Sequence, residues 1–402
     1  MSRWLSCVLI GVAIWVLGCG GNNNSTTGTG NNPIAPAANN VAAIAAGNVA
    51  SNPEGVVNAA FTSATICLPG TSNCATLDGL LVDTGSTGMR VLASVLPAGF
   101  SLPQQTDSNG NPIGECAQFG DGFTWGPVQT ADMTIAGEKA SSLPIQVINP
   151  NFAPVPTECT ANALGPQEDT LATLGANGIL GVGDFLQDCG PACAASGAPG
   201  AYFTCPASGC VATTESLTQQ VQHPVALFAT DNNGVIVELP SVGSGGAVSV
   251  NGSLVFGIGT QSNNGLNGAT VLTLDANGNF TTVFKGTPFS GSFVDSGSNG
   301  LFFLDSTTTG MPVCTDVAFY CPGSTQNFSA TNQGANGQST SISFSAGNAD
   351  TLLSGSNFLL PTLAAPNSGS FDWGLPFFYG RNIFVAIEGK STPGGTGPYT
   401  AY

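Results

Sequence analysis

The chain has 402 residues, with only 6 Lys and Arg against 23 Asp and Glu, which gives a formal net charge of −17. So few cations exclude a nucleic-acid-binding protein, because such a protein must neutralise phosphates. The single histidine excludes zinc sites built on several histidines. Hydrophobic residues make up 42% of the chain, which is enough for one or two folded cores.

The N-terminus has the pattern of a bacterial lipoprotein signal. A short basic segment precedes residues 4–17, which are apolar but too few for a membrane span. Gly18 then precedes Cys19, as in a lipobox, so we predict that residues 1–18 are removed and that Cys19 is lipidated. Gly20, rather than Asp, follows the cysteine and indicates the outer membrane, on its periplasmic side or at the cell surface. The alternative is a plain secretory signal with an incidental cysteine.

A tether is predicted to follow the lipidated cysteine. Residues 19–50 are assigned to it, because residues 20–40 are rich in Gly, Asn, Ser and Thr and lack apolar periodicity. The segment VAAIAA at 41–46 is ambiguous, since it also fits a first strand. The anchor would attach the protein to the membrane of the cell envelope without spanning it.

The cysteines indicate an oxidising compartment. Apart from Cys7 and Cys19, ten of the 12 cysteines remain, an even number that allows five disulfides. Their spacing leaves the pairing of four clustered cysteines open, and a metal site there is disfavoured because no C-x-x-C spacing occurs. The candidates are Cys67 with Cys74, Cys314 with Cys321, Cys116 with Cys159, and the cluster Cys189, Cys193, Cys205 and Cys210.

The local pattern is typical of β-structure. Short alternating apolar runs at 75–82, 234–239, 280–286 and 341–346 are separated by turn dipeptides such as Asn-Gly. Helical periodicity is scarce, and residues 214–222 are its best candidate. We therefore predict an all-β protein.

An internal repeat divides the chain. Residues 81–91 read LVDTGSTGMRV and residues 293–303 read FVDSGSNGLFF, with their aspartates 212 positions apart, at 83 and 295. Each repeat is followed by a glycine-containing apolar segment, at 178–183 and 372–378. This arrangement predicts two homologous β lobes, each with one Asp-Thr/Ser-Gly loop.

These repeats resemble the two active-site loops of pepsin-like aspartic peptidases. Residues 119–137 are similar to the flap hairpin of that family, and residues 373–389 are similar to its last strands. The resemblance implies a bilobal pepsin-like fold of two pseudo-symmetric β-barrel lobes, 51–223 and 224–402, with a cleft between them. The chain also resembles a family of bacterial lipoproteins known only as a domain of unknown function.

The resemblance also implies a chemistry, namely peptide hydrolysis by a water activated between Asp83 and Asp295. Two carboxylates brought close share one proton, so one member acts as general base and the other as general acid. This chemistry requires only water, so we expect no cofactor and no metal, with a peptide or protein substrate in the cleft of a monomer. The supporting residues are Gly85 and Gly297, which allow close approach, Ser86 and Ser298, which donate to the carboxylates, and Thr84 and Ser296, which link the loops.

Two positions depart from the family pattern. Its flap Tyr and the Trp that this Tyr contacts are replaced by Phe119 and Arg90. Phe119, Gly120 and Trp125 are the flap candidates, although Trp125 more readily fits a residue that packs inside the hairpin. Arg90 is expected to extend along the surface; near the cleft it would instead favour the ionised form of both aspartates.

These departures keep other functions open. One is a catalytically inactive pepsin-like lipoprotein that binds a peptide or glycan, and another is a structural surface lipoprotein without a ligand. Residues 107–111 and 275–279 faintly resemble calcium loops, but they lack the required Gly and Glu and are predicted to be hairpin turns. His223 lies at the junction of the predicted lobes and is expected to be structural.

Overall fold

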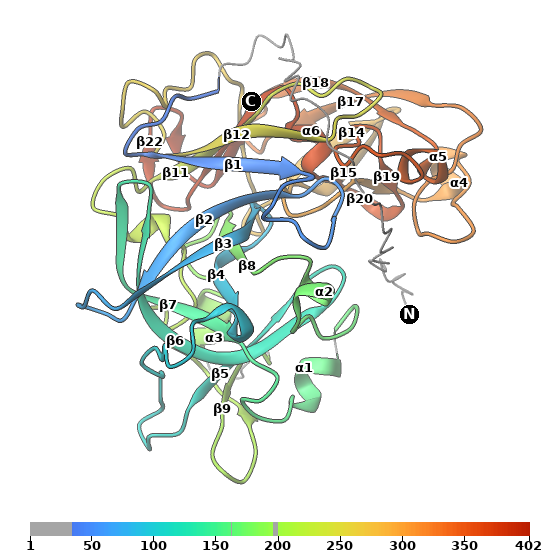
Figure 1. Cartoon of the computed structure of the whole chain (residues 1–402). Helices are drawn as coiled ribbons and strands as arrows, with labels where there is room; N and C mark the ends of the chain where they lie inside the picture. The colour runs from blue at the N-terminus through green and yellow to red at the C-terminus, as the bar shows by residue number, and fades with distance from the viewer. Residues whose placement is uncertain (1–33, 162, 196–199) are drawn as a thin grey trace, which may run out of the picture.

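The computed structural model describes residues 34–402 except 162 and 196–199, and it shows an all-β protein with only short helices (Figure 1). The four alternating runs form strands, because alternation places one side of each run in the core. They are β3 (Cys74–Asp83), β11 (Gly234–Leu239), β14 (Phe280–Phe284) and β18 (Ser339–Ala346).

The helix predicted at 214–222 is not formed, and the segment contains turns instead. Gln220 explains this difference, because its buried side chain bonds to backbone atoms outside any helical ladder. Its amide donates to the carbonyls of Gly190 and Glu215, both at 2.9 Å, and its oxygen accepts from the Gly190 N–H at 2.8 Å. Side-chain bonds of this kind compete with helical backbone bonds.

The largest sheet has fifteen strands, and part of it closes on itself. Strand β2 pairs with β3 on one side and with β6 on the other, which completes a six-stranded ring in the order β2-β3-β8-β4-β7-β6. In sheet order the strands are β10 (Val211–Ala212), β9 (Tyr202–Thr204), β5 (Ile113–Gln118), β6 (Phe123–Ile135), β7 (Glu138–Ile148), β4 (Thr87–Leu92), β8 (Gly178–Val182), β3, β2 (Ala60–Cys67), β1 (Val41–Gly47), β12 (Ser249–Phe256), β11, β21 (Arg381–Ala386), β24 (Tyr399–Ala401) and β13 (Val271–Thr273).

The second sheet has seven strands and lies entirely in the C-terminal half of the sequence (Figure 1). Its buried face is aromatic: the ring of Phe371 stacks on Phe303 and on Trp373. Its order is β18, β17 (Gln326–Gln333), β14, β15 (Thr287–Val294), β20 (Asn367–Trp373), β16 (Leu301–Leu304) and β19 (Ala364–Ala365); β22 (Ser391–Thr392) and β23 (Gly395–Thr396) form a separate hairpin. The helices are α1 (Thr157–Ala161), α2 (Leu171–Leu174), α3 (Pro191–Ala194), α4 (Ser306–Thr309), α5 (Ala349–Leu353) and α6 (Leu375–Phe378).

The ambiguous segment after the predicted tether is a strand. β1 pairs antiparallel with β12 from Val41↔Val255 to Gly47↔Ser249, and it also meets β2 at Ala46↔Ala60. The assignment of 19–50 to a tether is therefore too long at its C-terminal end, because the apolar alternation of VAAIAA is used in the sheet. The signal peptide and Cys19 lie outside the described residues.

The two repeats have the same strand topology. In the first, β8 lies parallel to β3 (Asp83↔Gly181) and antiparallel to β4 (Gly88↔Gly181). In the second, β20 lies parallel to β15 (Val294↔Trp373) and antiparallel to β16 (Leu301↔Trp373). Each Asp-Thr/Ser-Gly loop thus connects two strands that are separated by the glycine-containing segment downstream of it.

Five disulfides are formed, as expected. The pairs Cys67–Cys74, Cys116–Cys159 and Cys314–Cys321 are those predicted. The open cluster pairs between sequence neighbours, as Cys189–Cys193 and Cys205–Cys210. Among the described residues, none of the helices is long and apolar enough to cross a membrane.

Candidate functional site

The first aspartate loop begins at the last residue of β3. The Gly85 N–H donates to Oδ1 of Asp83 at 2.8 Å, and the Ser86 hydroxyl donates to Oδ2. Both carboxylate oxygens are therefore oriented by donors from their own loop, and Asp83 is only 6% exposed. A carboxylate held in this way has one fixed direction in which to face a reactant.

The second loop repeats this arrangement immediately after β15. The Gly297 N–H donates to Oδ1 of Asp295 at 2.7 Å, and the Ser298 hydroxyl contacts Oδ2 at 2.8 Å. The same hydroxyl also lies 2.6 Å from Oδ2 of Asp372 on β20. Asp295 thus has the same two kinds of hydrogen bond as Asp83 and, in addition, an acidic neighbour, Asp372.

Reciprocal hydrogen bonds join the two loops. The Thr84 N–H donates to Oγ of Ser296 at 3.1 Å, and the Ser296 N–H donates to Oγ1 of Thr84 at 2.9 Å. Each hydroxyl then donates to the opposite strand, Ser296 to the Val82 carbonyl at 2.6 Å and Thr84 to the Val294 carbonyl at 3.3 Å. All these groups are buried, so the four bonds fix the relative position of loops that are 212 residues apart.

Each carboxylate lies against the glycine of the opposite loop. A Cβ placed on Gly85 would stand 2.5 Å from Cγ of Asp295, and one on Gly297 would stand 2.7 Å from Oδ1 of Asp83. Neither glycine has a positive φ, so it is this close approach that requires glycine. The structure therefore brings Asp83, Asp295 and their six predicted supporting residues together in one place.

The electrostatics of the two halves differ. Burial raises the pKa of Asp295 well above its ordinary value, and the negative charges of Asp83 and Asp372 raise it further. Burial also raises the pKa of Asp372 to about 8, against a lowering by the Ser298 hydroxyl. Burial and these neighbouring charges therefore favour the protonated form of Asp295.

The predicted flap is the hairpin of β5 and β6. Its turn is closed by the Phe119 N–H, which donates to the Gly122 carbonyl at 2.8 Å, and Gly120 is exposed at the tip. Trp125, in contrast, is fully buried against Phe152 and Phe203, and its indole N–H donates to the Ala153 carbonyl at 2.9 Å. Trp125 is therefore a packing residue and not a cover for the site, because its side chain points into the hydrophobic cluster behind the hairpin.

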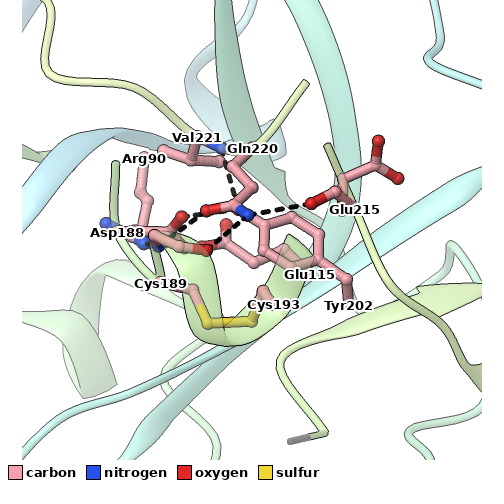
Figure 2. Close-up of a disulfide and its surroundings, with 10 residues drawn as sticks. Arg90, Glu115, Asp188, Cys189, Cys193, Tyr202, Glu215, Gln220 and Val221 are labelled. Carbon is pink, nitrogen blue, oxygen red and sulfur yellow. Dashed lines mark hydrogen bonds and ion pairs between the residues drawn. A yellow bond between two sulfur atoms is a disulfide. The ribbon is translucent and has the colours of Figure 1, made fainter. Parts of the chain in front are cut away.

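Arg90 does not extend along the surface as expected. It is 2% exposed and pairs with Glu115 at 2.5 Å and with Asp188 at 3.3 Å (Figure 2). Asp188 in turn accepts from the Tyr202 hydroxyl at 2.6 Å, next to the Cys189–Cys193 disulfide. A buried guanidinium requires such partners. The two acids that pair with Arg90 are close to it in space but distant in the sequence. Among the described residues, Arg90 forms ion pairs with these two acids and with neither Asp83 nor Asp295.

Sequence reasoning missed three acidic residues near the site. Asp372 could have been suspected, because it interrupts an otherwise apolar segment in the second repeat. Asp121 follows the flap tip, and burial raises its pKa, with a further contribution from the charge of Asp83. Burial and the charge of Asp121 raise the pKa of Glu168 to about 8. No sequence pattern links Glu168 to the flap, because the contact is tertiary.

A cavity of about 390 Å³ opens beside the first loop. It lies between the Thr84–Thr87 segment, the flap residue Phe119 and the turn at 277–279 from the other half of the chain. Arg90, Asp184, Phe185, Asp188 and Phe293 complete most of its wall. Its volume is in the range of small-ligand pockets.

The remaining polar motifs are structural. Asp107 accepts bonds from Asn109, Asn111 and Thr204, and Asp275 accepts from the N–H groups of Asn277 and Asn279, as hairpin turns require. Buried His223 contacts the Gly183 carbonyl at 3.1 Å through Nε2, and burial lowers its pKa to about 4.

The fold and the site together define an all-β, disulfide-bridged protein with two cross-linked aspartate loops. The chain belongs to the family described as protein of unknown function DUF3443, whose model matches residues 36–402. No curated protein matches the chain.

Proposed function

We propose that the protein is a pepsin-like aspartic peptidase of the bacterial cell envelope, anchored through Cys19. In this proposal each half of the chain forms one lobe, and a peptide lies in the cleft between the lobes. Asp83 and Asp295 activate a water molecule that hydrolyses the peptide bond.

The single observation that carries the proposal is the cross-linking of the two loops. The reciprocal Thr84–Ser296 bonds and the packing of each carboxylate against the opposite glycine place the two carboxyl groups next to each other. A β-turn needs no such cross-link, whereas a shared-proton dyad does, because its geometry must be held against charge repulsion.

The electrostatics support a division of roles between the two aspartates. Asp295 has the raised pKa and holds the proton, so it donates to the oxygen of the scissile carbonyl. Asp83 accepts a proton from water, whose oxygen attacks the carbonyl carbon. When the tetrahedral intermediate breaks down, the C–N bond cleaves and the leaving amine takes the proton that Asp83 accepted from water. Asp295 regains its proton from the hydroxyl group of the intermediate as the new carboxyl group forms, so that the chemistry uses only water and the two acids.

The position of Arg90 favours this function over an inactive binding protein. Glu115 and Asp188 neutralise its charge, and among the described residues it forms no ion pair with Asp83 or Asp295. Phe119, at the flap position, supplies an apolar contact in place of the polar flap residue of the family.

The test is cleavage of a mixed peptide library by the full-length chain, expressed in an oxidising compartment and assayed from acidic to neutral pH. We expect Asp83→Asn and Asp295→Asn to lower kcat/KM by about 10²–10⁴-fold, with Asp316→Asn, an exposed acid, as the matched control. A statine-containing peptide should inhibit the wild type. Cleavage that survives in either dyad variant, or absence of cleavage by folded wild type, contradicts the proposal. In the second case, binding without cleavage would identify the inactive alternative.

The anchor is tested separately. Cys19→Ser should move the protein from the membrane fraction to the soluble fraction of the envelope. Retention in the membrane fraction would contradict lipidation at this position.

A further inference from the structure

The cavity beside the first aspartate loop contains an acid without a partner. Asp184 lies two residues after the end of β8 and lines the cavity together with Thr84, Gly85 and Ser86. Its Oδ1 atom is buried and has no hydrogen-bond partner. A buried carboxylate oxygen in this state is costly to the fold, and a ligand that supplied the missing donor would remove this cost.

The surroundings of Asp184 are negative and held in place. The Glu388 N–H donates to the Asp184 carbonyl at 2.8 Å, and the Glu388 carboxylate accepts from the Leu186 N–H at 2.9 Å. Asp188 lines the same cavity, and its one cationic neighbour, Arg90, is also paired with Glu115. Among the described residues, the ion pairs involve only Arg90 and Lys139, so Asp184 has no cation of its own. Burial and the charge of Glu388 raise the pKa of Asp184, and a bound cation would favour its ionised form.

The rest of the wall suits a long side chain. Phe119 and Phe185 supply aromatic surface for an aliphatic stem. The turn at 277–279 lies against Phe185 and Asp184, since a Cβ on Gly278 would stand 3.2 Å from the Phe185 ring and 3.6 Å from Oδ2 of Asp184. The whole chain carries a formal charge of −17, which attracts cationic ligands to any acidic opening.

We propose that this cavity is a subsite for the basic side chain of a peptide, a Lys or Arg close to the scissile bond, with Asp184 as its anionic partner. The inference rests on the proposed function, because the cavity opens beside Gly85 and Ser86 of the first catalytic loop. An ammonium or guanidinium group would supply the donor that Oδ1 lacks, in a charge-assisted hydrogen bond.

The experiment uses octapeptides that are identical except for one residue, which is Lys, Arg, norleucine, Gln or Glu, placed in turn at each position. Fluorescence anisotropy gives the Kd of each peptide, and mass spectrometry gives its cleavage rate. At one position we expect Lys and Arg to be preferred over norleucine by about tenfold or more, the size of a hydrogen bond to a charged group. Asp184→Asn should bring this ratio close to one, whereas Asp316→Asn should leave it as in the wild type.

The outcomes separate this proposal from the peptidase proposal. Cleavage without a basic preference at any position overturns the subsite and leaves the dyad intact. A basic preference in binding without any cleavage supports the subsite and overturns hydrolysis. A preference for Gln assigns the cavity to a carboxamide and overturns the proposal, and absence of both binding and cleavage overturns both. The wild-type comparison decides these outcomes even if Asp184→Asn fails to fold.

Discussion

The two aspartate loops are flanked by strands in the same arrangement and orient their carboxylates in the same way, but one pair of facing strand positions beside them differs in charge. In the first half Arg90 lies opposite Ile179, and in the second half Phe302 lies opposite Asp372. Both pairs combine a charged residue with an apolar one. In the first half the charge is positive and lies on β4, the strand that follows the loop. In the second half it is negative and lies on β20, the strand that corresponds to β8.

This difference breaks the symmetry of the site. The cation of the first half is neutralised by Glu115 and Asp188 and forms no ion pair with Asp83 among the described residues. The acid of the second half contacts Ser298, which also contacts Asp295, and its charge raises the pKa of Asp295. A duplicated scaffold thus produces two unequal acids, which is what a pair with separate acid and base roles requires.

The largest effect on stability is expected from a substitution of Arg90 in the first half. Arg90→Met would leave Glu115 and Asp188 buried without their cation, which costs about 3–5 kcal/mol. Denaturant unfolding measures this loss. Arg381→Met is the control, because Arg381 stacks on Phe377 and forms no ion pair among the described residues. The double variant Arg90→Met/Glu115→Met should recover part of the loss; no recovery would show that the pair does not act as a unit.

In the second half, Asp372→Asn tests how the buried acid makes the free energy of unfolding depend on pH. The folded pKa of Asp372 is raised to about 8, so the folded state binds its proton more tightly than the unfolded state does. Asp372 therefore reduces stability progressively as the pH rises from about 4 to about 8, and the Asn variant lacks this loss. The free energy of unfolding of Asp372→Asn relative to wild type should rise across this window by on the order of a few kcal/mol. A pH-independent difference would contradict the assignment, and Asp316→Asn serves as the control.

The cross-link between the halves is tested by Thr84→Val and Ser296→Ala. Each change leaves a buried N–H of the opposite loop without its acceptor, at a cost of about 1–3 kcal/mol. Thr65→Val, at an exposed threonine pair, is the matched control and should change stability little. Because the two residues form one network, the double variant should lose less than the sum of the single losses. Simple additivity would mean that the loops are held independently.

The smallest difference is expected between Ser86→Ala and Ser298→Ala. Each removes a hydroxyl bond to its own aspartate, worth about 1 kcal/mol. Ser298 also contacts Asp372, so its removal should cost more and should shift the Asp295 limb of the activity profile to higher pH. Equal costs and unchanged profiles for both variants would show that Asp372 does not influence the second loop.

The elements that depend on local pattern could be predicted from the sequence. Alternating runs became strands, paired Asp-Thr/Ser-Gly motifs became equivalent loops, and cysteines seven residues apart across a turn became disulfides. These features follow from side-chain periodicity and short loop closure, which involve neighbours along the chain. The lipidation of Cys19 and the catalytic activity remain predictions.

The surroundings of individual side chains depend on contacts between distant strands and could not be predicted from the sequence. Arg90 was expected to extend along the surface and Trp125 was considered as a cover for the cleft, but both are buried, because partners from distant strands surround them. Asp372 became part of the site because β20 pairs with β15 and places it beside Ser298, 74 residues away. A pKa depends on burial and on charges in space, so the sequence could name the two aspartates but not which of them keeps the proton.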